Sequence, residues 1–280
     1  MNKFSQPSAE HTVLFDWDLS QFERLVENCA YDEAITLGVP YLPRIGKILE
    51  AGSGPGHVVA YLIAQGFDIE GVELNAAVIA EMNKLKPEIP LSVGDVGKLN
   101  TPDGYYNGLL SFGVIEHFKE GPAEVLAEHH RVLAPGGIAV ITVPCLNLVR
   151  RIKRGWFLRT ARLRPSLNNF LRHKTGRPPV HLNRRGIDGF RFEVNPIRGP
   201  FFEYWFTPKE FETAVQAAGF TVLESKPTHH AVGLWGEFGS WAAYNERRRF
   251  KTTRLGQMLD AVLGHRGFVH NHMHTIVARK

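Results

Sequence analysis

Apolar residues follow two different patterns along the chain. Short unbroken runs, rich in Val, Ile and Leu, alternate with longer stretches in which apolar residues recur every three or four positions. Runs of the first kind are typical of strands buried on both faces, and stretches of the second kind are typical of helices packed on one face. Strands that alternate with helices favour right-handed βαβ units and a parallel sheet. We expect strands at 45–50, 67–73, 91–95, 106–112 and 138–143, and helices at 57–65, 76–86 and 122–132.

Further elements are predicted before and after this alternation. Residues 21–37 form one amphipathic stretch, which predicts a helix ahead of the first strand. After Pro144 the alternation stops, and it resumes at Thr207, where a Thr-Pro-x-Glu pattern predicts a capped helix start. Two more strands are expected, at 220–225 and 273–278. The pattern therefore predicts a single α/β domain over 1–280 with an insertion at 147–202.

A glycine-rich turn lies between the first strand and its helix. Its glycines let a ligand approach the backbone closely, and an acid, Glu73, closes the second strand. An acid at that point is typical of sites that bind ribose hydroxyls. The dinucleotide pattern G-x-G-x-x-G is absent, because His57 stands where its third glycine would be. The turn thus predicts a nucleoside-bearing ligand other than a dinucleotide.

Composition excludes several classes of protein. No apolar run is long enough to cross a bilayer, and Met1–His11 lacks the basic and apolar pattern of a signal peptide. Two cysteines, Cys29 and Cys145, are too few for a disulfide framework, so a cytoplasmic protein is expected.

The net charge of +5 is unevenly distributed. Residues 147–200 hold 14 Lys or Arg and two acidic residues, which leaves 19 basic and 26 acidic residues elsewhere. Aromatic residues are interleaved with the basic ones in this segment. It is expected either to bind an anionic substrate, such as a nucleotide-sugar, a lipid-linked glycan, a phosphorylated metabolite or RNA, or to be a solvated cap.

Five motifs in order carry a resemblance to a known family. They are Glu50-Ala51-Gly52-Ser53-Gly54-Pro55-Gly56, the acid Glu73, Gly94-Asp95-Val96, the stretch 111–117, and Leu133-Ala134-Pro135-Gly136-Gly137. At this spacing the chain resembles the class I S-adenosylmethionine-dependent methyltransferases over 45–145, and weakly again over 203–225. The resemblance implies a Rossmann-like, doubly wound sheet of seven strands, with the last strand antiparallel, helices on both faces and a basic lid inserted after the fifth strand.

The resemblance also implies which residues bind the cofactor, S-adenosylmethionine, and its product S-adenosylhomocysteine. Glu50 would bond the turn or the ammonium group, Glu73 the ribose hydroxyls, and Asp95 the adenine amino group. Phe112 would lie beside the methionine moiety. The full implied set is Glu50, Gly52, Ser53, Gly54, Gly56, Glu73, Leu74, Asp95, Val96 and Phe112.

Methyl transfer needs a general base only when the acceptor must lose a proton. His117 follows the fourth strand and is the candidate base, because histidine titrates near neutrality; alternatively it only closes the loop. Tyr204 is a candidate acceptor contact, or else a core residue.

No metal is expected. Relatives that bind a divalent metal here carry E-x-x-E-H, and Gly113 replaces the first Glu of that pattern. The alternating His270, His272 and His274 would share one face of a strand, as metal ligands or as a strand end.

The expected function is methyl transfer from S-adenosylmethionine to an oxygen or nitrogen of a small-molecule, nucleotide-sugar or lipid- or glycan-linked biosynthetic intermediate. Two alternatives stay open: RNA methylation that uses the basic insertion, and a non-catalytic partner subunit that binds the cofactor. The sequence does not set the oligomeric state.

Overall fold

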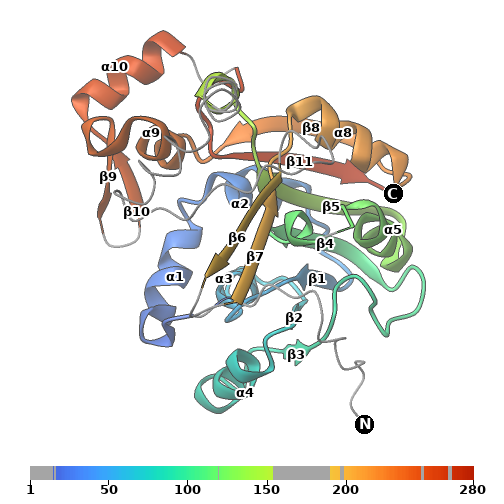
Figure 1. The fold of residues 1–280 in the computed structure, drawn as a ribbon. Coiled ribbons are helices and arrows are strands. Elements are labelled where there is room, and N and C mark those ends of the chain that lie inside the picture. Colours follow the sequence, from blue (N-terminus) through green and yellow to red (C-terminus); the bar gives the residue numbers. More distant parts are fainter. Residues whose placement is uncertain are drawn as a thin grey trace.

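The computed structural model describes residues 15, 17–118, 120–153, 190–195, 199–246, 249–263 and 267–280. Its main sheet has seven strands in the order β3-β2-β1-β4-β5-β11-β8 (Figure 1). The strands are β1 (Ile48–Ala51), β2 (Ile69–Glu73), β3 (Leu91–Val93), β4 (Tyr106–Phe112), β5 (Leu133–Pro144), β8 (Thr221–Thr228) and β11 (Met273–Arg279).

The strand directions confirm the predicted topology. Strands β1 to β5 pair in parallel, whereas β11 is antiparallel to both of its neighbours, β5 and β8. From β1 the chain builds outward first through β2 and β3 and then, on the other side, through β4 and β5. In such sheets ligands bind at the switch point, beside the carboxyl ends of the two central strands.

Helices cover both faces of the sheet, as predicted. One face carries α1 (Phe22–Cys29), α2 (Glu33–Gly38), α3 (His57–Ile63) and α4 (Ala76–Leu85), and the other carries α5 (Ala123–Val132) and α8 (Pro208–Ala217). Leu62 and Met82 are fully buried on the first face, and Leu126 and Phe211 on the second. Burial of each such side chain stabilises the fold by roughly 1.5–3 kcal/mol. The hydrophobic cores on the two faces of the sheet fix the positions of the strand ends at which the site lies.

Two sequence predictions about element boundaries are wrong. The helix expected at 21–37 is two helices, because Asp32 Oδ1 accepts hydrogen bonds from the N–H groups of Ala34 (2.9 Å) and Ile35 (3.1 Å) and begins a new one. The fifth strand begins at Leu133, five residues earlier than expected, since Leu133 already pairs with β4 before an irregularity in the register.

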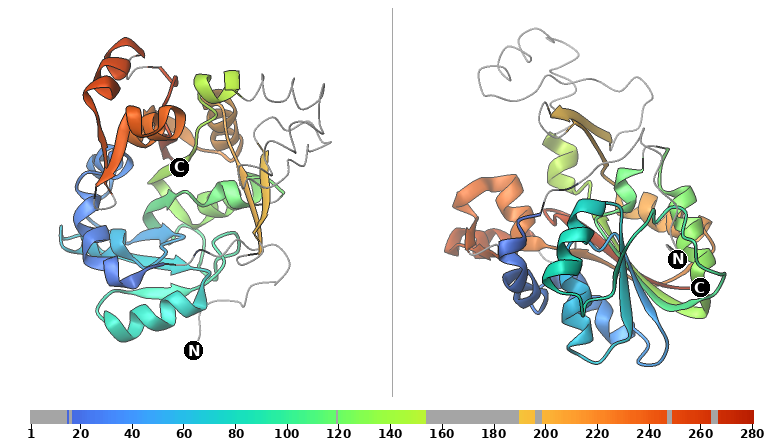
Figure 2. Two further views of the ribbon diagram at one scale, coloured as in Figure 1. Left: turned by 60° about the vertical axis from the view of Figure 1, so that its left-hand side comes forward. Right: turned by 90° about the horizontal axis from the view of Figure 1, so that it is seen from below.

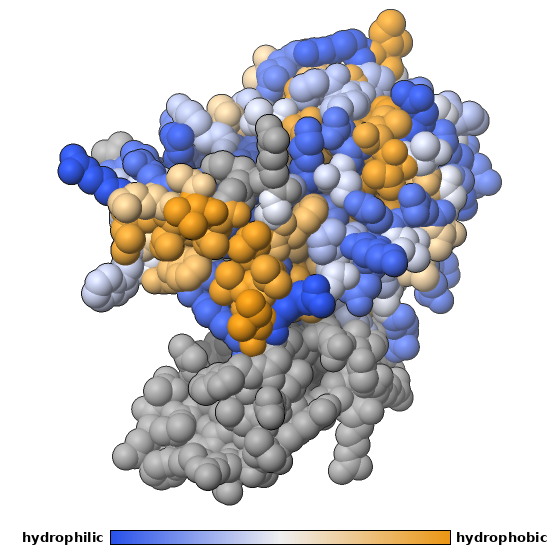
Figure 3. All heavy atoms as spheres, turned by 90° about the horizontal axis from the view of Figure 1, so that it is seen from above, coloured by the Kyte–Doolittle hydropathy of each residue, from blue (hydrophilic) through white to orange (hydrophobic). Residues whose placement is uncertain are grey.

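The chain after β8 builds a C-terminal unit that the sequence analysis did not predict. It contains α9 (His230–Phe238), η4 (Gly239–Trp241), β9 (Ala243–Glu246), β10 (Arg249–Thr252) and α10 (Arg254–Leu263). Figures 1 and 2 show this unit beside α1, and the Arg249 guanidinium lies 3.6 Å from the centre of the Tyr31 ring. Leu255, Met258 and Val262 of α10 are exposed, and Figure 3 shows apolar residues gathered on that side.

The insertion predicted at 147–202 is described only in part. Residues 148–153 are helical, and β6 (Phe190–Asn195) pairs antiparallel with β7 (Gly199–Tyr204) outside the main sheet. Arg150 and Lys153, two of its basic residues, both bind the carboxylate of Glu237 in α9. The remainder of the lid predicted over 147–202, at 154–189 and 196–198, lies outside the described residues. Within the described part of the chain, no helix has the length and hydrophobicity that a membrane span requires.

Candidate functional site

Two adjoining cavities lie at the carboxyl ends of the central strands. The larger has a volume of about 620 Å³ and the smaller about 340 Å³. Four residues line both: Trp17, Gly52, Phe112 and Gly113. Because Gly52 follows β1 and Gly113 follows β4, the junction of the cavities coincides with the switch point of the sheet.

The glycine-rich turn forms the wall between β1 and the larger cavity. Gly52, Gly54 and Gly56 have φ of 81°, 53° and 78°, which side-chain-bearing residues rarely adopt. A Cβ at Gly52 would stand 2.5 Å from Val114 Cγ2, and one at Gly54 would stand 2.7 Å from Trp17 Cζ2. The turn therefore requires glycine for its conformation and for its close packing.

Acids from the next two strands face the same cavity. Glu73 accepts hydrogen bonds from the N–H groups of Gly54 (2.9 Å) and Asn75 (2.9 Å), so the end of β2 is tied to the turn. Asp95 accepts one from the N–H of Gly97 (2.8 Å). Leu74 and Val96, predicted beside these acids, also line the cavity. The structure thus brings together Gly52, Gly54, Glu73, Leu74, Asp95, Val96 and Phe112.

Three buried polar groups near the turn have no hydrogen-bond partner among the described residues. Glu50 is 3% exposed, and its Oε2 has no hydrogen-bond partner among the described residues. Burial and, secondarily, the charge of Glu73 raise the pKa of Glu50 well above its usual range. Ser53 Oγ and His57 Nδ1 also lack partners in the described chain, and burial lowers the pKa of His57 to about 4. All three residues line the smaller cavity, which therefore has hydrogen-bonding groups available for a polar ligand.

His117 lies on η3 (Ile115–His117) and lines the larger cavity. Its ring meets the ring of Phe15 edge to face at 5.2 Å, and its Nε2 is 3.7 Å from Glu116 Oε1. Glu116 is 2% exposed, and burial raises the pKa of its carboxyl well above the usual range. His117 therefore has a buried carboxyl neighbour whose pKa is shifted upward.

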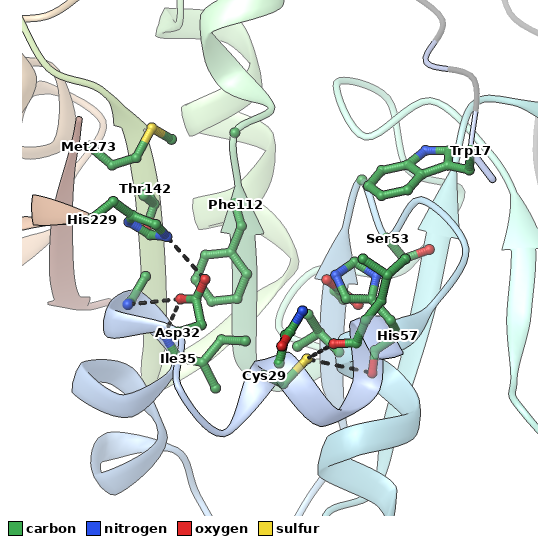
Figure 4. A pocket seen from close by; sticks show the side chains of 17 residues that line it. Trp17, Cys29, Asp32, Ile35, Ser53, His57, Phe112, Thr142, His229 and Met273 are labelled. Atoms are coloured by element: carbon green, nitrogen blue, oxygen red, sulfur yellow. Dashed lines mark hydrogen bonds and ion pairs between the residues drawn. The ribbon is translucent and has the colours of Figure 1, made fainter. Parts of the chain in front are cut away.

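The smaller cavity contains a paired carboxylate and imidazole that the sequence analysis missed. His229 Nε2 lies 3.0 Å from Asp32 Oδ2, and both residues line the cavity (Figure 4). Figure 4 shows His229, Thr142 and Met273 opposite Trp17 and His57. No local motif marks this pair, because its members are 197 residues apart in the sequence.

Several other predicted residues lie elsewhere. Tyr204 is 8% exposed, packs in the core on the α8 face, and does not line either cavity described here. The three C-terminal histidines have separate partners: His270 pairs with Asp260, His272 with Arg150, and His274 with Ser225. Within the described part of the chain, no three His, Cys, Asp or Glu side chains are grouped to hold a metal ion.

The fold and the site define a class of protein. A doubly wound sheet with a glycine-rich turn at its switch point, acids after the next two strands and a reversed last strand is that of the class I S-adenosylmethionine-dependent methyltransferases. A family model described as a methyltransferase domain matches residues 22–225, and the chain belongs to that family.

Curated relatives match over shorter lengths. A probable S-adenosylmethionine-dependent methyltransferase of Mycolicibacterium smegmatis is 29% identical over 97 residues, which are 35% of this chain and 37% of that protein. Malonyl-[acyl-carrier protein] O-methyltransferase of Enterobacter lignolyticus is 22% identical over 158 residues, 56% of this chain and 60% of that protein. The matches thus span between about a third and three fifths of these relatives.

Solved structures share the fold over most of the chain. A methyltransferase of Methanosarcina mazei aligns with a TM-score of 0.53 at 17% identity, covering 86% of this chain and 95% of that one. The 1,6-didemethyltoxoflavin-N1-methyltransferase of Burkholderia thailandensis, solved with 1,6-didemethyltoxoflavin and S-adenosylhomocysteine, aligns with a TM-score of 0.50 at 17% identity, covering 94% and 84%. At 17% sequence identity, these similarities show a shared fold and no more.

The residues present fit the cofactor of this family, S-adenosylmethionine. Gly52 and Gly54 line the larger cavity in positive-φ conformations, so the turn presents backbone rather than side chains to a ligand there. The buried Glu50 Oε2 has no partner in the described chain and suits an ammonium group, and the acids Glu73 and Asp95 suit hydroxyl and amino donors. Gly54, Glu73 and Asp95, three of the predicted cofactor contacts, all line the larger cavity.

Proposed function

We propose that this class I methyltransferase transfers a methyl group from S-adenosylmethionine to an oxygen or nitrogen atom of a small-molecule, nucleotide-sugar or lipid- or glycan-linked biosynthetic intermediate. The observation that carries the proposal is the junction of the two cavities, where Gly52, Phe112 and Gly113 line both. A cofactor with its adenosine part in the larger cavity would extend its methionine end across this junction toward Glu50, which lines the smaller cavity beside the proposed acceptor.

The chain's own residues would bind and orient the cofactor. Glu73 would accept from the ribose hydroxyls, Asp95 from the adenine amino group, and Glu50 from the ammonium group, with the Gly52–Gly56 turn beneath. When bound, S-adenosylmethionine supplies an electrophilic methyl group with a good leaving group, so the protein mainly aligns the acceptor with it.

The lining of the smaller cavity supports an acceptor whose reacting end is neutral. Among the described residues that line it are two carboxyl groups, Asp32 and Glu50, and no lysine or arginine. The basic residues of 147–202 are the proposed contacts for an anionic part farther from the reacting atom. His117, which lines the larger cavity, stays an alternative candidate for the base, and the core packing of Tyr204 supports a structural role more than an acceptor contact.

A labelling experiment tests this function. The chain is incubated with methyl-labelled S-adenosylmethionine and a protein-free small-molecule extract, and in parallel with total RNA. We expect label in a small molecule, whose identification gives the methylated atom.

The same experiment tests the two alternatives. Label in RNA, with binding that weakens steeply as salt rises, would favour RNA methylation by the basic insertion. Label in neither fraction, while the cofactor still binds, would contradict the proposed catalysis and favour a non-catalytic partner subunit.

A further inference from the structure

We propose that His229, oriented by Asp32, is the general base that takes the proton of a neutral hydroxyl acceptor in the smaller cavity. The inference rests on the proposed function, since it assigns the acceptor end of the same site. It is carried by a hydrogen-bonded carboxylate–imidazole pair that lines a cavity ending at the cofactor turn.

The contacts of Asp32 set the state of the imidazole. Asp32 Oδ1 is held by the N–H groups of Ala34 and Ile35, so Oδ2 is left to face His229 Nε2 at 3.0 Å. A carboxylate accepts hydrogen bonds, so Nε2 carries the proton and Nδ1 keeps its lone pair. His229 Nδ1 is buried and has no partner among the described residues. His229 lines the cavity, and its Nδ1 keeps the lone pair that a base requires.

The backbone at His229 supports a functional role. Its φ of 59° and ψ of 49° make it the one non-glycine residue with positive φ in the described chain. Strained conformations of this kind concentrate at functional sites. The carbonyl of His229 accepts from the N–H groups of Gly233 (2.9 Å) and His272 (3.3 Å), which hold the residue in place.

Hydrogen bonds across the sheet extend the polar wall of this cavity. Thr228, the residue before His229, bonds to Thr275 at 2.8 Å, and Thr275 bonds to Thr142 at 3.0 Å. Thr142 also lines the smaller cavity. The row of hydroxyls therefore ties the segment that carries His229 to the rigid strands β11 and β5.

Other groups near the cavity are less suited to be the base. Burial lowers the pKa of His57 to about 4, and the charge of Asp32 only partly offsets this, so His57 is a weak base. Burial raises the pKa of the Cys29 thiol, and it raises the pKa of Glu50, the proposed partner of the ammonium group, well above its usual range. For His229, burial lowers the pKa, but the charge and hydrogen bond of Asp32, with the charge of Glu33, raise it above its usual value.

The groups that face His229 come from several elements. Asp32 and Glu33 lie at the start of α2, and His230 and His272 are neighbours of His229. The cavity is also lined by Glu50, His57 and Cys29. His272 is neutral, because burial and the charge of Arg150 lower its pKa to about 3. The raised pKa of His229 thus depends mainly on Asp32, so its base form appears only above the usual pKa of histidine.

The proposed step is balanced without another reactant. A lone pair of the acceptor oxygen forms the new bond to the methyl carbon while the sulfur–carbon bond breaks and sulfur keeps that electron pair. The acceptor's O–H bond breaks, its electrons stay on oxygen, and its proton moves to His229 Nδ1. The imidazolium that forms is stabilised by the Asp32 carboxylate, and it releases the proton to solvent after the product leaves.

Three variants test the proposal. His229→Asn keeps a residue that tolerates the left-handed backbone conformation but removes the base. Asp32→Asn keeps the helix cap but removes the charge and turns a donor toward Nε2. His230→Gln is the matched control, because His230 also pairs with a carboxylate, Glu33 at 2.8 Å, but does not line either cavity.

The readouts are label transfer into the small-molecule extract across pH, affinity for S-adenosylhomocysteine, and the pKa of the His229 ring from NMR. We expect His229→Asn and Asp32→Asn to lower the rate by about 10²–10⁴-fold. We expect His230→Gln and all cofactor affinities to change by less than about 3-fold. The wild-type rate should rise with pH through the raised pKa of His229, and that ring pKa should fall in Asp32→Asn.

The contrary results are distinct. If His229→Asn keeps its rate within about 3-fold, or if His230→Gln loses as much rate as His229→Asn does, the base assignment is overturned. Loss of cofactor affinity in His229→Asn together with rate would assign it a structural role and overturn the proposal as well. If the wild-type chain labels no acceptor at all, the proposed function itself fails.

Discussion

The two cavities differ in how the chain builds them. The larger is lined by residues that follow three neighbouring strands, at Gly54, Glu73 and Asp95. The smaller shares the glycine-rich turn, through Glu50, Ser53 and His57, and adds residues from α1, the start of α2, the turn after β8 and the start of β11. A cavity of the first kind follows from local motifs on the sheet, whereas one of the second kind depends on contacts between distant segments. We infer that the first recognises the adenosine part of the cofactor and that the second, beyond Glu50, selects the acceptor.

The largest loss of cofactor affinity is expected from a substitution in the glycine-rich turn that lines the larger cavity. Gly54→Val places a β-branched residue at φ 53° and a Cβ 2.7 Å from Trp17 Cζ2. We expect affinity for S-adenosylhomocysteine, measured by calorimetry, to fall by about 100-fold or more, because both the turn and its packing must change.

Gly66→Ala is the matched control for Gly54→Val. Gly66 also has positive φ, at 82°, but no atom within 4 Å of its Cβ position. This variant should lower stability and keep the affinity. Equal affinity loss in both variants would mean that strain, rather than the cavity, accounts for the result.

A smaller effect is expected from one acid of the larger cavity. Glu73→Gln keeps the size of the side chain but removes the charge that accepts from two backbone N–H groups and, by our proposal, from the ribose hydroxyls. Affinity for the cofactor product should fall by about 10–100-fold, since hydrogen bonds to charged groups contribute about 1.5–3 kcal/mol.

The control for this acid is Glu70→Gln, on the same strand. Glu70 bonds to Tyr106 at 2.7 Å and to Lys47, and does not line either cavity. It should lose stability and keep the affinity. A normal affinity in Glu73→Gln would contradict the assignment of the ribose to this acid.

The smallest effect on the rate is expected from a substitution of Tyr204. This substitution tests whether Tyr204 packs in the core or contacts the acceptor. Tyr204→Phe removes one hydroxyl from a residue that is 8% exposed. We expect the free energy of unfolding, from urea titration, to fall by no more than about 1.5 kcal/mol and the rate of label transfer to change by less than about 3-fold. A rate loss of 10-fold or more with unchanged stability would restore the acceptor contact that the sequence suggested.

The same contrast explains what the sequence analysis predicted. The strand–helix alternation, the turn at Gly52–Gly56 and the acid Glu73 are local features, and the structure has them where they were expected. Asp32 lies inside a continuous apolar periodicity, so neither the helix break nor its cavity position is visible from the pattern. His229 follows a strand with no motif around it, and only the folded chain brings it to Asp32.

A crystal structure of the chain with S-adenosylhomocysteine tests the central claim, a cofactor cavity joined to an acceptor cavity, most directly. We predict ribose hydroxyls on Glu73, the adenine edge at Asp95, and the sulfur at the junction lined by Gly52, Phe112 and Gly113, open toward His229. A ligand whose ribose lies away from Glu73, or whose sulfur points away from the smaller cavity, would contradict the account.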